Sequence, residues 1–364
     1  MQTALVMAGG TGGHVMPALA VAEALRGDGW RIVWLGTRQG MEARIVRERG
    51  FEMAWIDFAG VRGKGLLRLA KLPFQMLAAF RQARRAILDV RPDVAVGLGG
   101  YVAFPGGVMA VLSGRPLVIH EQNAVAGMTN RVLACLAKRV LLGLPGAFGQ
   151  GADKPLPCGK VKTEWVGNPV RPEIAGIAPP AERYAGRSGR LRLLVIGGSL
   201  GAAALNDVVP RALARMQPAA RPEVRHQAGA RNIDELKANY AAAGVEAECL
   251  PFIDDMAAAY EWCDVVLCRA GASTIAELAA AGVPAGLVPY PHAVDDHQTL
   301  NARFLADADA AWLLPQDKLG VDELAVWLGS LSRAELLHRA EEARRVGKPE
   351  AAREMAAIVK ETAK

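Results

Sequence analysis

The sequence has little of several features that mark other classes of protein. Aromatic residues make up 5% of its 364 residues, and its five cysteines (positions 135, 158, 249, 263 and 268) form no Cys-x-x-Cys pair. No cluster of histidine and cysteine has the spacing of a zinc site. No tail rich in lysine or arginine favours nucleic acid as a partner. We therefore expect reduced, mostly buried thiols in a cytosolic protein, no bound metal and no nucleic acid.

Signals for export or for a membrane span are also missing. The first stretch, MQTALVMAGG, has no basic region and its apolar run is cut by glycines, so it predicts a β-strand rather than a signal peptide. Residues 94–114 carry no charge over 21 positions, which is long enough to cross a bilayer. Their six glycines and Pro105 instead indicate a strand (VAVGLG), a loop (GYVAFPGG) and a short helix (VMAVLSG). The sequence thus predicts no transmembrane span.

The composition that is present points to a two-domain α/β protein with an anionic partner. A chain of 364 residues, 51% of them hydrophobic, is long enough for two cores. The 39 glycines suit the tight turns of α/β folds. The net charge of +6 and the pI of about 9.2 favour an anionic lipid or a phosphorylated ligand.

The two halves of the chain begin alike. The stretches TALVMAGGTGGHVMPALAVAEAL and LRLLVIGGSLGAAALNDVVPRAL each predict a strand, a Gly-Gly turn and a helix. Strands alternate with helices in both halves, which predicts two Rossmann-like domains with parallel sheets. Prolines and glycines between 142 and 180 mark the boundary. We place the first domain at 1–165 and the second at 166–346, and expect a C-terminal helix, 347–364, to pack back on the first.

Each Gly-Gly turn predicts an anion site, because a strand, a tight turn and a helix N-terminus present backbone N–H groups together. Neither turn, GGTGGH or GGSLGA, matches the G-x-G-x-x-G pattern, and Gly36-Thr37-Arg38 stands where a dinucleotide site has an acidic residue. A nicotinamide-dependent oxidoreductase is therefore disfavoured. The alternative for either turn is close packing of strand and helix with no ligand.

His14 follows the first turn, at the N-terminus of a helix predicted over 15–25 with Pro17 in its first turn. The helix dipole there disfavours imidazolium, so we expect a neutral ring. A neutral histidine can act as a general base on a sugar hydroxyl. The alternative is a histidine that caps or packs locally.

The stretch 264–301 predicts one βαβ unit whose polar residues gather at the C-terminal ends of its strands, where α/β sheets bind ligands. Its helix is predicted to start near Ser273 or Thr274 and to end at Gly282. Glu277 then has two compatible roles. It is a capping-box partner of Thr274, or a first-turn carboxylate that accepts the hydroxyls of a ribose and is kept ionised by the helix dipole.

Two acidic pairs superficially match metal motifs. Asp307-Ala308-Asp309 ends a helix with no buried strand before it, and hard cations need further oxygen ligands. Asp295-Asp296 likewise lacks supporting ligands. We therefore assign neither pair to a metal.

Residues 62–85 are basic and apolar together. They hold seven basic residues interleaved with leucines and phenylalanines, and 58–88 contain no acidic residue. Such a segment is typical of a membrane-interfacial surface. The alternative is an ordinary core-facing helix with a solvated basic face.

Six motifs occur in order along the chain: GGTGGH, HEQN, GNPVR, GGSLGA, PFIDDMAAAY and RAGASTIAELAAAGVPAGLVPYP with DDHQTLNA. As a set they resemble those of the N-acetylglucosaminyltransferases of peptidoglycan synthesis. The resemblance covers nearly the whole chain. It implies a GT-B fold with the active site in the cleft between two domains, no cofactor and no obligatory metal. It implies inverting β(1→4) transfer of N-acetylglucosamine from UDP-N-acetylglucosamine to undecaprenyl-diphosphate-MurNAc-pentapeptide (lipid I).

The resemblance also implies roles for single residues, matched by position. In the second domain Ile253 would contact uracil through its backbone, Glu277 the ribose and Gln298 the sugar hydroxyls. His14 would be the base on the MurNAc 4-hydroxyl. His297 departs from the family, whose close members have a second glutamine there. The other donor-binding positions are Ser199 with the helix behind it at the diphosphate, Ala272, Ser273, Thr274, Ile275 and Ala276 along the same pocket, and Thr11, Gly12, Gly13, Asn123 and Arg171 approaching from the facing side.

The family's setting implies a peripheral protein on the cytoplasmic face of the inner membrane, docked on anionic lipid through residues 62–85. Other cell-wall and division proteins are partners that the resemblance allows. Two other GT-B activities, a UDP-N-acetylglucosamine 2-epimerase and a glycolipid synthase, remain alternatives. A non-catalytic membrane-recruited adaptor is a further alternative of a different class.

Overall fold

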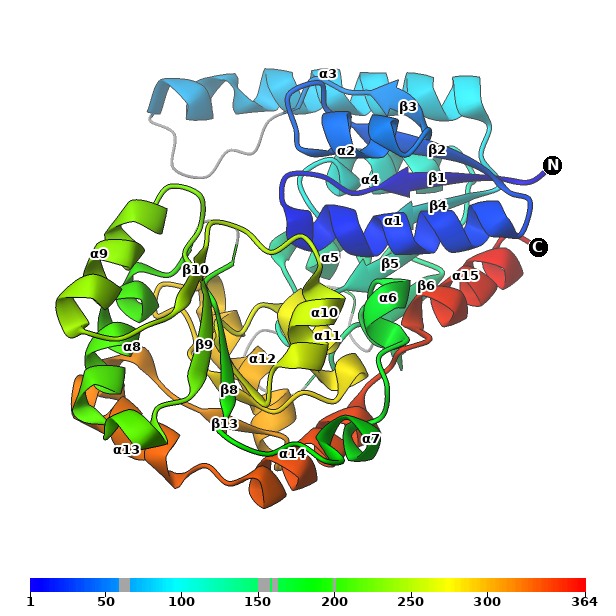
Figure 1. The fold of residues 1–364 in the computed structure, drawn as a ribbon. Coiled ribbons are helices and arrows are strands. Elements are labelled where there is room, and N and C mark those ends of the chain that lie inside the picture. Colours follow the sequence, from blue (N-terminus) through cyan, green and yellow to red (C-terminus); the bar gives the residue numbers. More distant parts are fainter. Residues whose placement is uncertain (59–65, 150–157, 159–162, 199–200) are drawn as a thin grey trace. The chain divides into compact units, whose positions relative to one another are not determined.

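The computed structural model describes residues 1–58, 66–149, 158, 163–198 and 201–364, with only the backbone for 66–71 and 294 (Figure 1). The chain forms two compact units. Unit 1 comprises Met1–Val170 together with Pro349–Lys364, and unit 2 comprises Arg171–Lys348. Each unit is built around one parallel sheet, which confirms the predicted α/β class with two Rossmann-like domains.

The sheet of unit 1 has the order β3-β2-β1-β4-β5-β6-β7, and all its strand pairs are parallel. Its central strands are apolar throughout because helices cover both faces. The strands are β1 (Thr3–Met7), β2 (Arg31–Gly36), β3 (Glu52–Trp55), β4 (Val94–Gly97), β5 (Leu117–Glu121), β6 (Arg139–Leu142) and β7 (Thr163–Trp165).

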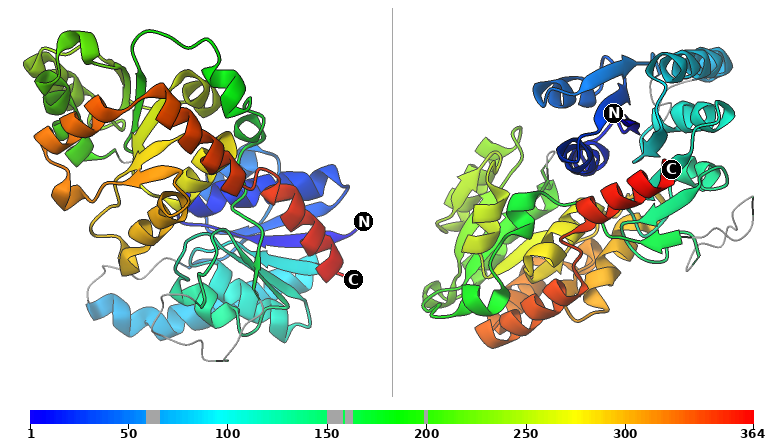
Figure 2. Two further views of the ribbon diagram at one scale, coloured as in Figure 1. Left: turned by 90° about the horizontal axis from the view of Figure 1, so that it is seen from below. Right: turned by 90° about the vertical axis from the view of Figure 1, so that its right-hand side faces the viewer.

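Two cores lie on the two faces of this sheet. On one face α1 (Gly12–Gly27) and α15 (Ala351–Thr362) share a core that includes Leu19 and Met355. On the other face lie α3 (Leu66–Val90), α4 (Ala103–Leu112) and α5 (Met128–Leu133), while α2 (Glu42–Glu48) follows β2. The N- and C-termini therefore lie close together in unit 1, as the views of Figures 1 and 2 agree.

Unit 2 repeats this plan with the strand order β10-β9-β8-β11-β12-β13, again all parallel. Its strands are β8 (Arg192–Ile196), β9 (Glu223–Gln227), β10 (Glu248–Leu250), β11 (Val265–Cys268), β12 (Ala285–Leu287) and β13 (Ala311–Leu313). Its helices are α6 (Pro172–Ala175), α7 (Pro180–Tyr184), α8 (Ala203–Arg215), α9 (Ile233–Ala243), α10 (Met256–Trp262), α11 (Ala272–Ala281), α12 (His297–Ala306), α13 (Val321–Ser330) and α14 (Arg333–Val346), with short 3-10 turns at Pro218–Ala220, Val294–Asp296 and Gln316–Lys318.

The starts of α4 and α1 differ from the prediction. Residues 103–107, predicted as loop, begin α4, because Pro105 is in its first turn, where a missing N–H loses no hydrogen bond. Helix α1 begins at Gly12 rather than at residue 15, so Pro17 lies inside it and not in its first turn. Both helices begin directly after glycine turns, and the low helix propensity of glycine led the prediction to place their starts too late. Residues of the first turn can still be helical there, because their N–H groups have no partner within the helix.

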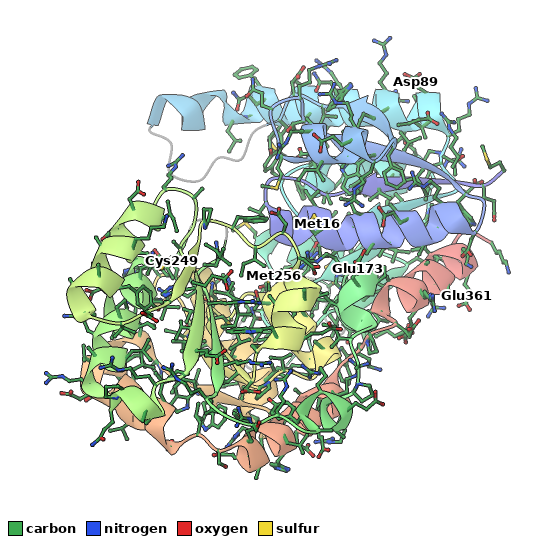
Figure 3. All side chains as sticks on the ribbon, in the orientation of Figure 1. Met16, Asp89, Glu173, Cys249, Met256 and Glu361 are labelled. Carbon is green, nitrogen blue, oxygen red and sulfur yellow. A yellow bond between two sulfur atoms is a disulfide. The ribbon has the colours of Figure 1, made fainter. Side chains whose placement is uncertain are left out.

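The prediction of reduced cysteines is wrong for one pair. Cys135 and Cys158 form a disulfide with their Cα atoms 5.6 Å apart. A separation of 23 residues gives no local signal for such a pairing, which depends on tertiary proximity. Cys263 and Cys268 are buried free thiols, and burial raises the pKa of each to about 12. Cys249, on β10, is only half-buried (Figure 3).

Within the described ranges, no helix combines the length and the apolar character needed to cross a membrane.

Buried His226 should make the protein sensitive to acid. Its Nδ1 lies 3.0 Å from the Tyr240 hydroxyl and its Nε2 3.1 Å from Asn206 Oδ1, and burial lowers its pKa to about 3. An unfolded histidine has a pKa of about 6.5, so the unfolded state takes up a proton first as the pH falls. We expect the contribution of His226 to the free energy of unfolding to be intact above pH 6.5 and to fall by about 2 kcal/mol between pH 7 and pH 5.

Denaturant unfolding at the two pH values tests this expectation. The His226→Gln variant should lose about 2 kcal/mol less than the wild type on acidification. The exposed His338 supplies the control, since its replacement by glutamine removes a histidine that lies outside the core. Equal acid sensitivity in the wild type and the His226 variant would contradict the assignment.

Candidate active site

In unit 1 the chain reverses its direction of travel across the sheet between β1 and β4. Strand β2 follows β1 on one side, whereas β4 and β5 continue on the other. Ligands of α/β folds bind at the carboxyl ends of strands at such a switch point. The loops that meet here are Ala8–Thr11 after β1 and Leu98–Val102 after β4.

Two consecutive glycines let these loops touch. A Cβ on Gly100, whose φ is +80°, would lie 2.1 Å from the carbonyl oxygen of Gly9. A Cβ on Gly99, whose φ is +99°, would lie 2.5 Å from Nδ1 of His14. The loop GLGGY after β4 can therefore approach the first glycine turn closely, because Gly99 and Gly100 have no side chains.

His14, the third residue of α1, is half-buried, and its Nδ1 lies 3.1 Å from the carbonyl oxygen of Leu98. A carbonyl can only accept, so in the neutral ring Nδ1 carries the proton and Nε2 keeps its lone pair. That tautomer is the one a general base requires. The first amides of α1, from Gly12 and Gly13, have no acceptor within the helix. The exposed N-cap residue, Thr11, makes no side-chain cap bond to them either.

The polar tail HEQN after β5 holds this edge together. The buried Glu121 carboxylate accepts from the backbone N–H of Asn123 at 3.0 Å and from Nδ2 of Asn130 at 2.9 Å. Gln122 donates through Nε2 to the Leu98 carbonyl that also bonds His14. Asn123 is half-buried and is oriented by its bond to Glu121.

The matching edge of unit 2 lies at the carboxyl ends of β8 and β11. Ser199 lies outside the described residues. The preceding Gly198 is fixed by Gln227, which accepts from its N–H at 3.1 Å and donates to its carbonyl at 3.0 Å. Gln227, buried at the end of β9, was missed by sequence reasoning, because a polar residue gives no clear signal at the end of a strand whose sequence is EVRHQ.

Helix α11 starts earlier than predicted, and the capping box is wrong. Its N-cap is Gly271, which offers no side-chain oxygen, so Thr274 is the third helical residue and Glu277 the sixth. Glu277 is therefore not in the first turn, and the dipole argument for its ionised form does not apply. Burial instead raises its pKa, while Arg171 and Tyr260 act in the opposite direction.

The Glu277 carboxylate has one partner on each oxygen. Nη2 of Arg171 lies 3.1 Å from Oε1, and the buried Tyr260 hydroxyl donates to Oε2 at 3.2 Å. The Glu277 side chain is 19% exposed, so lone pairs remain accessible to a ligand. Arg171 is the first residue of unit 2 and so belongs to the same unit as Glu277, as the predicted boundary at residue 166 implied.

The remaining predicted donor positions of unit 2 differ in accessibility. Ser273, Thr274 and Ala276 are half-buried on α11, as is Ile253 in the loop before α10. Ala272 is buried, and the Ile275 side chain, at 0% exposure, belongs to the core. Because the helix starts at Gly271, the backbone amides of Ala272 to Thr274 stand open at its N-terminus, where anions bind.

Gln298, in the first turn of α12, accepts from the Tyr290 N–H through Oε1 at 2.9 Å. Its Nε2 is thereby directed as a donor for a ligand oxygen, and His297 beside it is half-buried. Arg269, also missed from the sequence, supports this loop by donating to the Val288 and Pro289 carbonyls, both at 3.2 Å.

The described residues hold no group of three or more His, Cys, Asp or Glu side chains arranged for a metal ion. Asp309, of the Asp-x-Asp pattern, instead pairs with Arg339 at 2.5 Å and lies 3.2 Å from Nε2 of His338.

Two parallel-sheet units, each with a glycine turn at its switch point, form the architecture of the GT-B fold. Sequence profiles of the glycosyltransferase family 28 N-terminal and C-terminal domains match residues 4–142 and 192–356. The chain is 57% identical over 363 residues to the UDP-N-acetylglucosamine–N-acetylmuramyl-(pentapeptide) pyrophosphoryl-undecaprenol N-acetylglucosamine transferase of Dechloromonas aromatica, spanning 100% of this chain and 99% of that protein. It is 59% identical to the same-named protein of Aromatoleum aromaticum, spanning 100% of this chain and 98% of that one. The chain belongs to this family of N-acetylglucosamine transferases.

Solved structures agree with this assignment. MurG of Acinetobacter baumannii is 38% identical and superposes with a TM-score of 0.85, covering 99% of this chain and 100% of that one. A putative UDP-N-acetylglucosamine 2-epimerase of Listeria monocytogenes is 13% identical with a TM-score of 0.64, covering 98% of this chain and 95% of that one. The latter shares the fold alone, so sequence identity separates the two activities and the fold does not.

Proposed function

We propose that the chain transfers N-acetylglucosamine from UDP-N-acetylglucosamine to the MurNAc 4-hydroxyl of lipid I, with inversion, giving lipid II. The observation that carries the proposal is the identity of 57% and 59% to near-full-length relatives named for this transfer. The geometry of each unit supplies groups suited to one part of the reaction.

Unit 2 would hold the donor. The open amides at the start of α11 suit the diphosphate, and Ser199 with α8 would receive it from the other turn. Glu277 would accept the ribose hydroxyls through the lone pairs that Arg171 and Tyr260 leave unused. Ile253 would contact the uracil and Gln298 would donate to a hydroxyl of the sugar.

Unit 1 would activate the acceptor. Nε2 of His14 takes the proton of the MurNAc 4-hydroxyl as that oxygen forms a bond to C1 of the sugar. The bond from C1 to the phosphate oxygen breaks on the opposite side, so UDP leaves and the configuration inverts. The negative charge that develops on UDP would be stabilised by the open helix amides and by Arg171, whose guanidinium has further donors beyond the one on Glu277.

The proposed membrane contact uses α3. Phe74 is 77% and Leu77 48% exposed, and Arg81, Arg84 and Arg85 are exposed on the same helix. Residues 62–65 of the predicted segment lie outside the described ranges. We propose peripheral docking of α3 on anionic lipid at the cytoplasmic face of the inner membrane, where each basic residue near the surface adds about 1 kcal/mol.

Replacing Phe74 and Leu77 by serine should lower partition onto phosphatidylglycerol vesicles about tenfold or more, since each buried apolar side chain contributes ~1.5–3 kcal/mol. Sedimentation with vesicles measures this effect. Val326, 72% exposed on α13, gives the matched control when it too is changed to serine. Wild-type partition by the double variant, or equal binding to uncharged phosphatidylcholine, would contradict docking through α3.

The reaction is tested by UDP release from UDP-N-acetylglucosamine in excess EDTA, with and without a lipid I analogue. Release that requires the analogue supports the transferase. Donor binding without release would favour a non-catalytic adaptor, and conversion of the sugar without any acceptor would identify an epimerase. A lipid I analogue with a short lipid chain also allows catalysis to be measured without vesicles.

A further inference from the structure

We propose that Glu42 is a positioning residue for the transfer step, setting the glycine turn that leads into His14. The inference rests on the proposed function, in which His14 is the base. Glu42 is the first residue of α2 and is 0% exposed. Among the described residues no Lys, Arg or His nitrogen lies within 4.0 Å of its carboxylate in a salt bridge. An unpaired buried carboxylate is expensive unless N–H and O–H groups satisfy it.

Hydrogen bonds from two different loops do satisfy it. The N–H of Gly10, in the loop after β1, donates to Oε2 at 3.2 Å. Thr37, in the loop after β2, donates to Oε1 through its N–H at 3.0 Å and its hydroxyl at 2.9 Å. Both oxygens therefore accept from backbone N–H groups, which only a carboxylate can do without loss.

Three glycines leave space for this carboxylate. A Cβ on Gly40 would lie 2.2 Å from both of its oxygens, and a Cβ on Gly9 would lie 2.9 Å from Oε1. A Cβ on Gly36 would lie 2.9 Å from Cγ of Glu42. The backbone closes around the carboxylate on three sides, so its position is fixed rather than one of several.

The network continues to the loop after β4. Because the Thr37 hydroxyl gives its one proton to Glu42, it accepts from the Tyr101 hydroxyl at 3.3 Å. The Tyr101 ring covers Gly10, where an added Cβ would lie 3.1 Å from Cε1. That same loop carries the Leu98 carbonyl that fixes the tautomer of His14. One carboxylate thus links the turn before His14 to the loop that orients its ring.

Two variants test the proposal in the full-length protein. In Glu42→Gln an NH₂ group replaces one of the two carboxylate oxygens. It then faces the backbone N–H of Gly10 or of Thr37, two donors meet, and that hydrogen bond is lost. Thr37→Val keeps the shape and removes the link to Tyr101, and Thr37→Ser restores the hydroxyl. Glu52→Gln, on the neighbouring strand β3 in an exposed pair with Arg31, is the carboxylate control.

We expect kcat to fall about 10²-fold in Glu42→Gln and about tenfold in Thr37→Val, since a misplacement of ~1 Å can cost 10²-fold. The Kd for UDP should not change in either variant, and Thr37→Ser should recover the rate. The ¹⁵N shifts of the His14 ring should show loss of the Nδ1–H tautomer in Glu42→Gln and Thr37→Val but not in Thr37→Ser. If Thr37→Val lowers the Tm but keeps the wild-type kcat and ¹⁵N shifts, Glu42 contributes to stability alone, and the inference is wrong. A wild-type protein with no acceptor-dependent UDP release would instead remove the proposed function, and the inference would fall with it.

Discussion

Purified His14→Ala is expected to retain the fold and the donor affinity and to lose about 10²–10⁴-fold in kcat, the range over which a positioned general base acts. The bond from Nδ1 to the Leu98 carbonyl, 3.1 Å long, leaves Nε2 as the basic nitrogen, and alanine removes it. The measurement is acceptor-dependent UDP release at saturating donor, with the Kd for UDP determined by calorimetry.

The control for this experiment is His338→Ala, which changes an exposed histidine of unit 2 and should turn over normally. Near-normal turnover of His14→Ala would end the assignment of the base. A large rise in the Kd for UDP with unchanged kcat would move His14 to donor binding. A loss of kcat alone agrees with the role proposed here.

Glu277→Ala is expected to weaken binding of UDP about 100-fold, because hydrogen bonds to a charged group contribute about 1.5–3 kcal/mol and the change also leaves Arg171 and Tyr260 without their partner. Calorimetric titration with UDP and with uracil, which lacks the ribose, separates the two contributions. The effect should appear for UDP and vanish for uracil.

The exposed Glu173 on α6, labelled in Figure 3, provides the matched control through Glu173→Ala. A pH series adds a second criterion. Burial raises the pKa of Glu277, and a protonated carboxyl loses an acceptor for the ribose. Affinity should therefore decline on acidification at a higher pH than the value near 4.3 of an ordinary glutamate. Equal affinities of Glu277→Ala and the wild type at pH 7 would exclude the ribose role.

The spacing of apolar residues and the residue types of the turns were enough to predict the alternation of strands and helices, the two glycine turns and the polar strand ends. They failed where a helix start depended on backbone shape. Gly271 caps α11 in an extended conformation with no side-chain oxygen, so the pattern around Thr274 mimicked a cap that does not exist. The N-cap therefore lies three residues before the predicted one, and Glu277 is the sixth helical residue instead of the third. Burial raises its pKa, which is the opposite of the direction expected from the helix dipole.

Contacts between distant residues were beyond the reach of the sequence. Arg171 and Glu277 are 106 positions apart, and Gly10 and Glu42 are 32 apart. Nothing local marks either pair, because each depends on how loops from separate strands meet at one edge of a sheet. The family resemblance supplied separate roles for Arg171 and Glu277 but not the ion pair between them. The hydrogen bonds by which Glu42 and Gln227 hold the glycine turns were likewise visible only in the structure.

Helix α15 gives unit 1 a discontinuous chain, since Met355 and Val359 complete a core otherwise formed by residues of the first 170. Unit 2 is encoded without interruption between the two pieces. During synthesis, therefore, the later unit has all of its residues before the earlier one does, which inverts the usual N-terminal-first order of domain folding. Until residues 351–362 emerge from the ribosome, the nascent first unit exposes the apolar strip of α1 that α15 covers in the folded protein.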